Sequence, residues 1–303
     1  MNSHYQELLH EQLDTFLKKI STVQLYAASV KSNTKKLEAE LTSKKQAAEK
    51  LKEREDIDPV LKELNYVELR RFTYINPYTG QRDIFDFKKT NLEEQLKNLH
   101  LYKNRQYQWL LVEVYEFFED YIEWLYASIG FLNNSFWVAS DFGDISILEI
   151  KDKDLNWFHA KAVIKKKAPQ SIIERFRLKV PKISQMELVS ANNTNYRLAL
   201  KLIENFRHVI VHHNGNFNNK NEFIQLVLDK AMVGKNMKES ALHYISQFTG
   251  KINDVDTILL LEENIHSGFM HFDRLNKLIE TIISYSFIIN NELIAHFESK
   301  TSI

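Results

Sequence analysis

The segment 204–215, Glu-Asn-Phe-Arg-His-Val-Ile-Val-His-His-Asn-Gly, places an arginine and three histidines near the end of a predicted helix. Arg207 can hold and neutralise a phosphate through the planar fork of donors on its guanidinium group. His212 can accept or release a proton near neutral pH. Asn214 and Gly215 predict that the helix stops there. These side chains are sufficient for one reaction, the cleavage of RNA without a metal ion.

The string 206–215 resembles the motif of the HEPN superfamily (higher eukaryotes and prokaryotes nucleotide-binding), in which a histidine follows an arginine after a short interval. Four residues separate Arg207 from His212, and His208 follows the arginine directly, as the family's pattern allows. The resemblance covers residues 101–303. It implies an all-α bundle with the motif on a late helix, and a metal-independent endoribonuclease of bacterial or archaeal defence or toxin–antitoxin systems. It further implies an RNA substrate, a dimer, and an antitoxin or defence protein as partner.

The expected roles follow from the chemistry of RNA cleavage. His212 would remove the proton of a ribose 2′-hydroxyl or protonate the leaving 5′-oxygen. Arg207 would stabilise the charge that develops on the phosphorane. No cofactor and no metal ion are needed. His208 and Asn214 would orient the groups and contact the scissile phosphate, and His213 adds polar atoms beside them. Glu204 either orients an imidazole or forms an ordinary pair on the helix surface, and we favour the pair.

Other interpretations of the same residues remain open. His208 and His212, one helical turn apart, could share a zinc ion, but no cysteine or nearby carboxylate offers a third ligand. An arginine and histidines at a helix end also stabilise its negative C-terminal dipole. Positions five apart on a helix point about 140° from each other, so Arg207 and His212 do not share a face by spacing alone. The main alternative is therefore a catalytically inactive HEPN-like module that binds a partner protein or nucleotide. A purely structural helical protein is a third.

Composition limits the protein class. The chain has no cysteine, which excludes disulfides and fits a reducing cytoplasm, and its 7 glycines and 4 prolines predict a mostly helical fold. Lys+Arg 40 balances Asp+Glu 40, unlike a general nucleic-acid binder. We expect no signal peptide, because residues 1–7 show no basic end followed by an apolar core. We expect no membrane span, because the apolar run around 282–289 is interrupted by serines and too short. The most basic stretch is a solvated surface or a track for the RNA backbone; it contains Lys165, Lys166, Lys167, Arg175 and Arg177.

Hydrophobic periodicity predicts a mainly α fold with two parts. Residues 1–100 form a helical, partly coiled-coil arm with a possible β-hairpin at 72–87, and residues 101–303 form a HEPN-like helical domain. The carboxylates of the strongest helix, 107–132, are expected to face solvent. Apolar surface on 32–54 and 270–297 predicts a homodimer with its motifs close to a two-fold axis. The other expected helices span 5–20, 91–101, 171–178, 195–211, 221–231 and 239–248, and short strands span 145–150 and 257–261.

Overall fold

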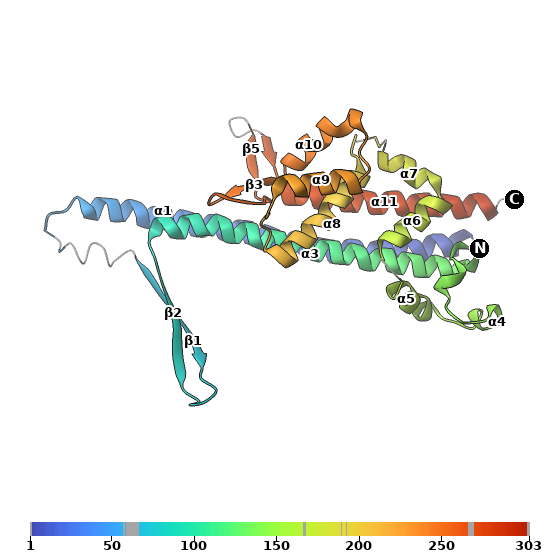
Figure 1. Cartoon of the computed structure of the whole chain (residues 1–303), viewed down its shortest axis with the longest axis horizontal. Helices are drawn as coiled ribbons and strands as arrows, with labels where there is room; N and C mark the ends of the chain where they lie inside the picture. The colour runs from blue at the N-terminus through green and yellow to red at the C-terminus, as the bar shows by residue number, and fades with distance from the viewer. Residues whose placement is uncertain are drawn as a thin grey trace. The chain divides into compact units, whose positions relative to one another are not determined.

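The computed structural model describes residues 2–56, 58, 67–165, 168–188, 190–191, 193–265 and 270–301. Within these residues the chain is mainly α-helical, with three two-stranded antiparallel sheets, so the predicted fold class is confirmed (Figure 1). The chain divides into two compact units. The hairpin unit comprises residues 27–106, and the helical unit comprises residues 1–26 with residues 107–303.

The hairpin unit contains the later part of helix α1 (Asn2–Lys52), strands β1 (Glu68–Ile75) and β2 (Arg82–Thr90), and the start of helix α3 (Leu92–Leu132). The strands pair antiparallel, and the register shifts between Phe72 and Thr73. This confirms the predicted hairpin, which extends away from the helices of its unit (Figure 1).

The two helices of the hairpin unit share a small apolar core. Its buried members, Leu41, Ala48, Leu92 and Leu99, repeat at intervals of seven residues on each helix. That interval keeps side chains on one face of a helix, as in a coiled coil. The predicted arm is therefore a helix pair with one apolar seam.

Aromatic side chains from four helices form the centre of the helical unit. Phe16 of α1 stacks on Tyr121 of α3, with ring centroids 5.1 Å apart. Tyr285 of α11 (Arg274–Thr301) contacts Phe118 of α3 at 6.1 Å and Tyr196 of α8 (Tyr196–His213) at 6.0 Å. These contacts bring the long helices of this unit into one bundle, with α8 held against its centre.

Shorter elements complete the helical unit. They are α4 (Ile147–Ile150), α5 (Leu155–Val163), α6 (Gln170–Lys179), α7 (Pro181–Leu188), α9 (Lys220–Lys230), α10 (Lys238–Ser246), β3 (Thr249–Ile252), β4 (Val255–Ile258), β5 (Glu263–Ile265) and β6 (Met270–Phe272). Strand β3 pairs with β4, and β5 with β6. The predicted strand at 257–261 is thus present, although it begins and ends earlier.

The structure corrects the predicted strand at 145–150. This segment forms the helical turn α4, because Ser146 caps it: the Ser146 hydroxyl accepts from the Glu149 amide, and the Glu149 carboxylate accepts from the Ser146 amide. In such a capping box, side-chain oxygens accept hydrogen bonds from backbone amides of the same segment. In a strand, these amides would need acceptors on another segment of the chain. Local capping therefore outweighs the β-propensity of the isoleucines.

Two boundaries also differ from the sequence prediction. The helices expected at 5–20 and 32–54 are one continuous helix, α1, which contains no glycine or proline. Its residues up to Tyr26 belong to the helical unit rather than to the predicted arm. The last helix begins at Arg274, because residues 270–272 form β6. The stretch Arg274–Ser299 of this helix, α11, is long and apolar enough to cross a bilayer. However, 56% of the stretch is buried inside the protein, as in a core helix.

Candidate functional site

Helix α8 positions the motif, and both of its ends are capped. The Asn195 side chain accepts from the Leu198 amide at 3.0 Å, and the apolar stripe that includes Phe206 and Ile210 is buried. At the other end, Asn214 adopts a left-handed conformation with φ 52°, and its amide donates to the Val209 carbonyl. The helix therefore stops where Asn-Gly predicts, with His212 and His213 in its last turn.

Gly215 fixes this helix end against α3 and β4. It has φ +73°, and a Cβ there would lie 2.2 Å from Oε1 of Gln108. The Gly215 carbonyl accepts from the Thr257 hydroxyl at 2.8 Å and from the Ile258 amide at 2.9 Å. Gln108 donates to the Ile258 carbonyl at 2.7 Å. Only glycine combines this conformation with this close approach.

Three histidines gather in the last turns of α8. The ring centroids of His208 and His212 are 4.6 Å apart, and those of His208 and His213 are 6.2 Å apart. All three residues are exposed. Desolvation lowers the pKa of His208, and the neighbouring charges of His212, His213, Lys230 and Arg207 lower it further. His208 is therefore neutral at pH 7, and one of its ring nitrogens can accept a proton.

Arg207 turns toward α3. Its Nη2 lies 3.3 Å from Oε1 of Glu116 and 3.8 Å from Oε2 of Glu119, and 38% of the side chain is exposed. Its Nε is buried and has no hydrogen-bond partner among the described residues. Neither a hydrogen bond nor an ion pair joins Arg207 to His212 within the described residues. Arg207 therefore pairs with α3 rather than with the motif histidine.

The carboxylates around Arg207 are the part of the site that the sequence interpretation missed. Glu116 and Glu119 were expected to form a solvated face, but both pair with the motif arginine. Burial raises the pKa of Glu119 to about 7; the Arg207 charge opposes this rise, and nearby carboxylates add to it. The sequence held one indication of this arrangement: Glu116 and Glu119 are three positions apart on α3, so they lie on one helix face and can approach the same cation.

The supporting residues have separate positions. Glu204 accepts from Lys201 at 2.8 Å and from Gln170 at 3.1 Å, so it forms a surface pair rather than orienting an imidazole. Lys230 on α9 donates to the Asn205 side chain at 2.8 Å. Because Lys230 also contributes to the lowered pKa of His208, it adds a cation near the histidines that the sequence did not indicate.

The predicted RNA-backbone track is engaged in internal contacts. Lys165 pairs with Asp141, whose side chain is nearly buried. Arg175 donates to the carbonyls of Phe136 and Trp137, at 2.7 and 3.2 Å. These side chains satisfy buried acceptors, so they do not form an outward-facing row. Lys166 and Lys167 lie outside the described residues.

Arg177 likewise belongs to a buried network. Glu187 of α7 is fully buried, and it accepts from Arg177 of α6 at 2.9 Å, from Arg197 of α8 at 3.2 Å and from the Tyr285 hydroxyl at 2.5 Å. The carboxylate thereby ties α6, α7, α8 and α11 together. Burial and the adjacent Glu187 charge raise the pKa of Tyr285 well above its ordinary value, so the phenol stays protonated and donates.

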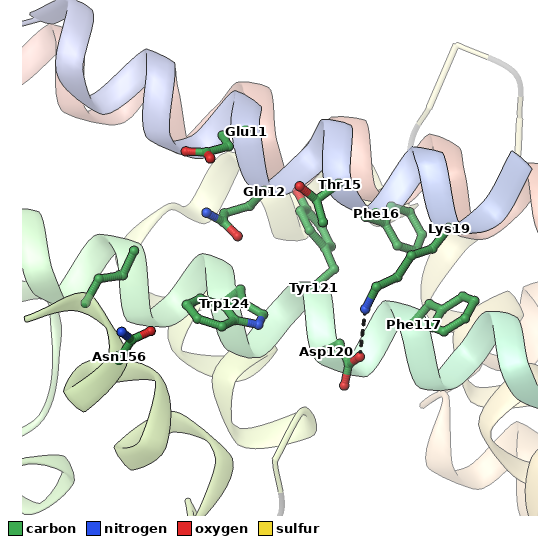
Figure 2. A pocket seen from close by; sticks show the side chains of 11 residues that line it. Glu11, Gln12, Thr15, Phe16, Lys19, Phe117, Asp120, Tyr121, Trp124 and Asn156 are labelled. Carbon is green, nitrogen blue, oxygen red and sulfur yellow. Dashed lines mark hydrogen bonds and ion pairs between the residues drawn. The ribbon is translucent and has the colours of Figure 1, made fainter.

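A groove of about 380 Å³ lies between α1, α3 and α5 in the helical unit (Figure 2). Phe16, Phe117 and Trp124 line it together with polar side chains, and Lys19 crosses it to Asp120 at 3.1 Å. No residue of the 204–215 segment lines this groove. The candidate chemistry is therefore placed at the exposed end of α8.

No group of three or more histidine, aspartate or glutamate side chains in the described ranges is arranged to hold a metal ion. The α8 end instead combines a partly exposed arginine, a neutral imidazole and two further imidazoles. Such groups can bind a phosphate and move protons beside it. Comparison with known proteins finds no matching family model, no matching curated protein and no matching solved structure.

Proposed function

We propose that this protein is a metal-independent endoribonuclease of HEPN type, acting in cellular defence or as a toxin in the cytoplasm. The observation that supports the proposal most is the exposed histidine cluster beside Arg207 at the capped end of α8. The ring centroid of His208 lies 4.6 Å from that of His212, and the neighbouring His212 charge is one of the causes that lower the pKa of His208. Neutral His208 can therefore act as a proton acceptor beside a second imidazole, and general acid–base catalysis requires such an acceptor.

The reaction would proceed by internal transfer within the RNA. The 2′-oxygen forms a bond to phosphorus, the bond from phosphorus to the 5′-oxygen breaks, and the products are a 2′,3′-cyclic phosphate and a 5′-hydroxyl. One imidazole of the cluster takes the 2′-hydroxyl proton, and another gives a proton to the leaving oxygen. His212 performs one of these steps, and neutral His208 is suited to accept the proton. Arg207 stabilises the additional charge on the phosphorane after exchanging its carboxylates for phosphate.

Arg207 and His212 diverge on one helix, so a homodimer would assist this mechanism. Two α8 ends facing each other across a two-fold axis could bring the arginine of one protomer toward the histidines of its partner. This arrangement remains a proposal. Light scattering that shows a monomer at working concentration would contradict it, as would a dimer whose motifs face opposite sides.

One observation favours a second function, that of a catalytically inactive HEPN-like module which binds a partner protein or nucleotide. Arg207 already has two carboxylate partners, Glu116 and Glu119. In an inactive module these ion pairs would be permanent, and Arg207 would only join α8 to α3. The two functions predict different results for substitution of His212: it abolishes RNA cleavage if the protein is a nuclease, and it has no effect on RNA if the module is inactive.

The test compares wild type with His212→Ala and Arg207→Ala, both expressed in a bacterium and purified. The matched control is His243→Ala, which replaces an exposed histidine of α10 away from the motif. We expect wild type and the control to slow growth and degrade cellular RNA. Loss of the acid–base group should lower cleavage by ~10²–10⁴-fold while the melting temperature stays near that of wild type. Full activity of a folded His212→Ala protein would refute the proposal.

A further inference from the structure

One stripe of helix α8 carries an amide and two imidazoles. Asn205, His208 and His212 follow one another at intervals of three and four residues, so at about 100° per residue they lie within an arc of about 60°. Arg207 points roughly 140° away from His212 by the same spacing, and it pairs with α3. The motif arginine is therefore not part of this stripe.

Helix α9 brings a cation to the stripe. The rings of Phe206 and Phe223 stack with a centroid distance of 5.5 Å, which holds α9 against α8. Lys230, in the last turn of α9, donates from Nζ to Oδ1 of Asn205 at 2.8 Å. Helical side chains lean toward the N-terminus, so the ring of His208 projects back toward the level of Asn205. Lys230 thus meets the stripe next to the first of its imidazoles.

The side chain that holds Lys230 is itself buried. Asn205 is 5% exposed, and its Nδ2 donates to the Lys201 carbonyl at 2.6 Å. Asparagine is a poor helix former, and a buried amide is costly unless it is hydrogen-bonded. Both ends of this amide have a partner, so its Oδ1 has a fixed direction and keeps the ammonium group in one place. Asn205 is therefore a positioning residue for Lys230.

The charges that act on His208 share one sign. Desolvation is the largest cause of its lowered pKa, and in the part of the chain that the structure describes the further causes are all cationic groups. These are the side chains of His212, His213, Lys230 and Arg207. A bound anion would offset the repulsion among these groups, and it would favour the charged form of the imidazoles.

The nearby carboxylates are engaged elsewhere. Glu204 pairs with Lys201 at 2.8 Å, and Asp229 accepts from a glutamine of its own helix at 2.7 Å. The carboxylates of α3 pair with the motif arginine, away from the stripe. Lys230 is exposed, and among the described residues it forms no ion pair. Asn205 occupies one of the three ammonium donors, so two donors remain for a ligand.

We propose that Lys230, positioned by Asn205, binds a backbone phosphate of RNA beside the histidine cluster of α8. The two remaining ammonium donors would bond nonbridging oxygens of the phosphate, next to the imidazoles that exchange protons with the ribose and the leaving oxygen. Lys230 would hold the phosphate in the substrate complex, and Arg207 would act on the charge that develops on the phosphorane. The identification of the anion as RNA rests on the proposed nuclease function, whereas the anion site itself does not.

A purely structural role for Lys230 fits these observations less well. A cation in the last turn of a helix interacts favourably with the helix dipole, and a lysine there can bond the last carbonyls of its own helix. Lys230 instead reaches across to α8, where a buried amide fixes it beside the imidazoles. A structural lysine would affect stability alone, and this difference can be measured.

The first experiment detects anion binding without cleavage. Full-length protein with carbon-13-labelled histidine is titrated with sodium phosphate at pH 7 and constant ionic strength, and the histidine ring signals are followed by NMR. We expect the signals of His208 and His212 to shift to saturation in wild type. Lys230→Met should weaken this binding roughly tenfold, the lower end for a hydrogen bond to a charged group. The control Lys238→Met neutralises an exposed lysine of α10 and should bind as wild type does. Absence of these shifts in wild type, or equal affinity in Lys230→Met, would overturn the anion site.

The second experiment places the phosphate in the reaction. Lys230→Met should raise the KM for RNA by ~5-fold at about 0.1 M salt, and should lower the slope of log(kcat/KM) against log salt by about 0.7, the value of one phosphate contact on a single strand. The kcat should change less, because a contact made equally in substrate and transition state contributes to binding alone. Lys230→Arg keeps the charge and should restore the slope. An unchanged KM and slope in a folded Lys230→Met protein would overturn the proposal, whatever its melting temperature.

Asn205 is tested through its effect on Lys230. Asn205→Leu removes the anchor and retains the ammonium group, so the KM should rise by no more than it does in Lys230→Met. The double variant replaces both partners by apolar groups of similar shape, which is nearly neutral for stability. Its KM should equal that of Lys230→Met, because the two residues act as one unit. Additive increases would show that Asn205 does not act through Lys230.

Failure of this inference can be told apart from failure of the nuclease. If wild type binds phosphate through Lys230 and cleaves no RNA, the anion site stands and the nuclease proposal fails. If wild type cleaves RNA and Lys230→Met keeps the wild-type KM, the nuclease proposal stands and this inference fails.

Discussion

The ion pairs between Arg207 and α3 provide a quantitative test of the role of Arg207. If this arginine binds the scissile phosphate, Glu116 and Glu119 compete with RNA for it. Replacing both glutamates by glutamine removes the competition with little change in side-chain size. Glu113→Gln is the matched control, because Glu113 is an exposed residue of α3 one turn earlier and, among the residues that the structure describes, forms no ion pair with Arg207.

The size of the effect follows from the exposure of the pairs. Arg207 is 38% exposed and Glu116 is 53% exposed, and ion pairs of this kind contribute ~0.2–1 kcal/mol each. Two such pairs sum to about 0.4–2 kcal/mol, which corresponds to a roughly 2- to 30-fold change in an equilibrium constant. We therefore expect the KM for RNA to fall by that factor in Glu116→Gln/Glu119→Gln, with Glu113→Gln close to wild type.

The pKa of Glu119 adds a pH dependence with a defined sign. Its value in the folded protein is about 7, above the ordinary value of a glutamate. The stabilisation that the protonated carboxyl provides is therefore complete below that ordinary value and is lost as pH rises through 7. Wild type should melt at a lower temperature at pH 8 than at pH 6 by an amount that Glu119→Gln abolishes. Ionised Glu119 also competes more strongly for Arg207, so the KM difference between the two proteins should be larger at pH 8.

The assay is steady-state cleavage of a labelled RNA at pH 6 and pH 8, together with thermal melting of each variant. An unchanged or raised KM in the double glutamine variant would refute the competition, and Arg207 would then not contact the phosphate. A KM change of equal size in Glu113→Gln would attribute the effect to general surface charge.

Three further substitutions test how the fold supports the site. Glu187→Gln leaves two arginines around a fully buried position without their charge partner, so the free energy of unfolding should fall by ~3–5 kcal/mol in denaturant titration; a loss below ~1 kcal/mol would show that the network is not coupled. Gly215→Ala combines φ +73° with a contact 2.2 Å from Gln108, and should cost more stability and activity than Gly80→Ala, which has φ +67° but no atom within 4 Å; equal losses would mean that the close approach is unimportant. Gly130→Ala would place a Cβ 2.3 Å from the Trp137 indole, and should lower the melting temperature and change the tryptophan fluorescence, whereas an unchanged spectrum would contradict this packing.

Local signals in the sequence were sufficient for the elements that they determine directly. Asn214 and Gly215 predicted the end of α8, because a left-handed residue ends a helix and few residue types adopt that conformation. The turn from Asn76 to Gly80 predicted the hairpin in the same way: Gly80 has φ +67°, and its amide donates to the Asn76 carbonyl at 2.8 Å. The apolar spacing at 195–211 predicted a helix, and α8 spans Tyr196–His213.

Contacts between distant segments could not be predicted from local patterns. Arg207 and Glu116 are 91 positions apart, so only the packing of α8 on α3 shows that a solvated-looking carboxylate faces the motif. Arg175 and Arg177 show the reverse error, since a basic sequence gives no indication that carbonyls of residues 136 and 137 or the buried Glu187 will accept from them. The sequence shows which residues are charged, whereas tertiary packing determines which of their side chains are free to bind a ligand.

The central claim is that the histidine cluster of α8 catalyses RNA cleavage in which the RNA's own 2′-hydroxyl is the nucleophile. The most direct measurement analyses the ends of RNA fragments made by the purified wild-type protein in excess EDTA. The account predicts 2′,3′-cyclic phosphates and 5′-hydroxyls, no cleavage of DNA, and resistance of an RNA with a 2′-deoxy sugar at the scissile position. Cleavage that requires Mg²⁺ and leaves 5′-phosphates would contradict the account, because the nucleophile would then be water.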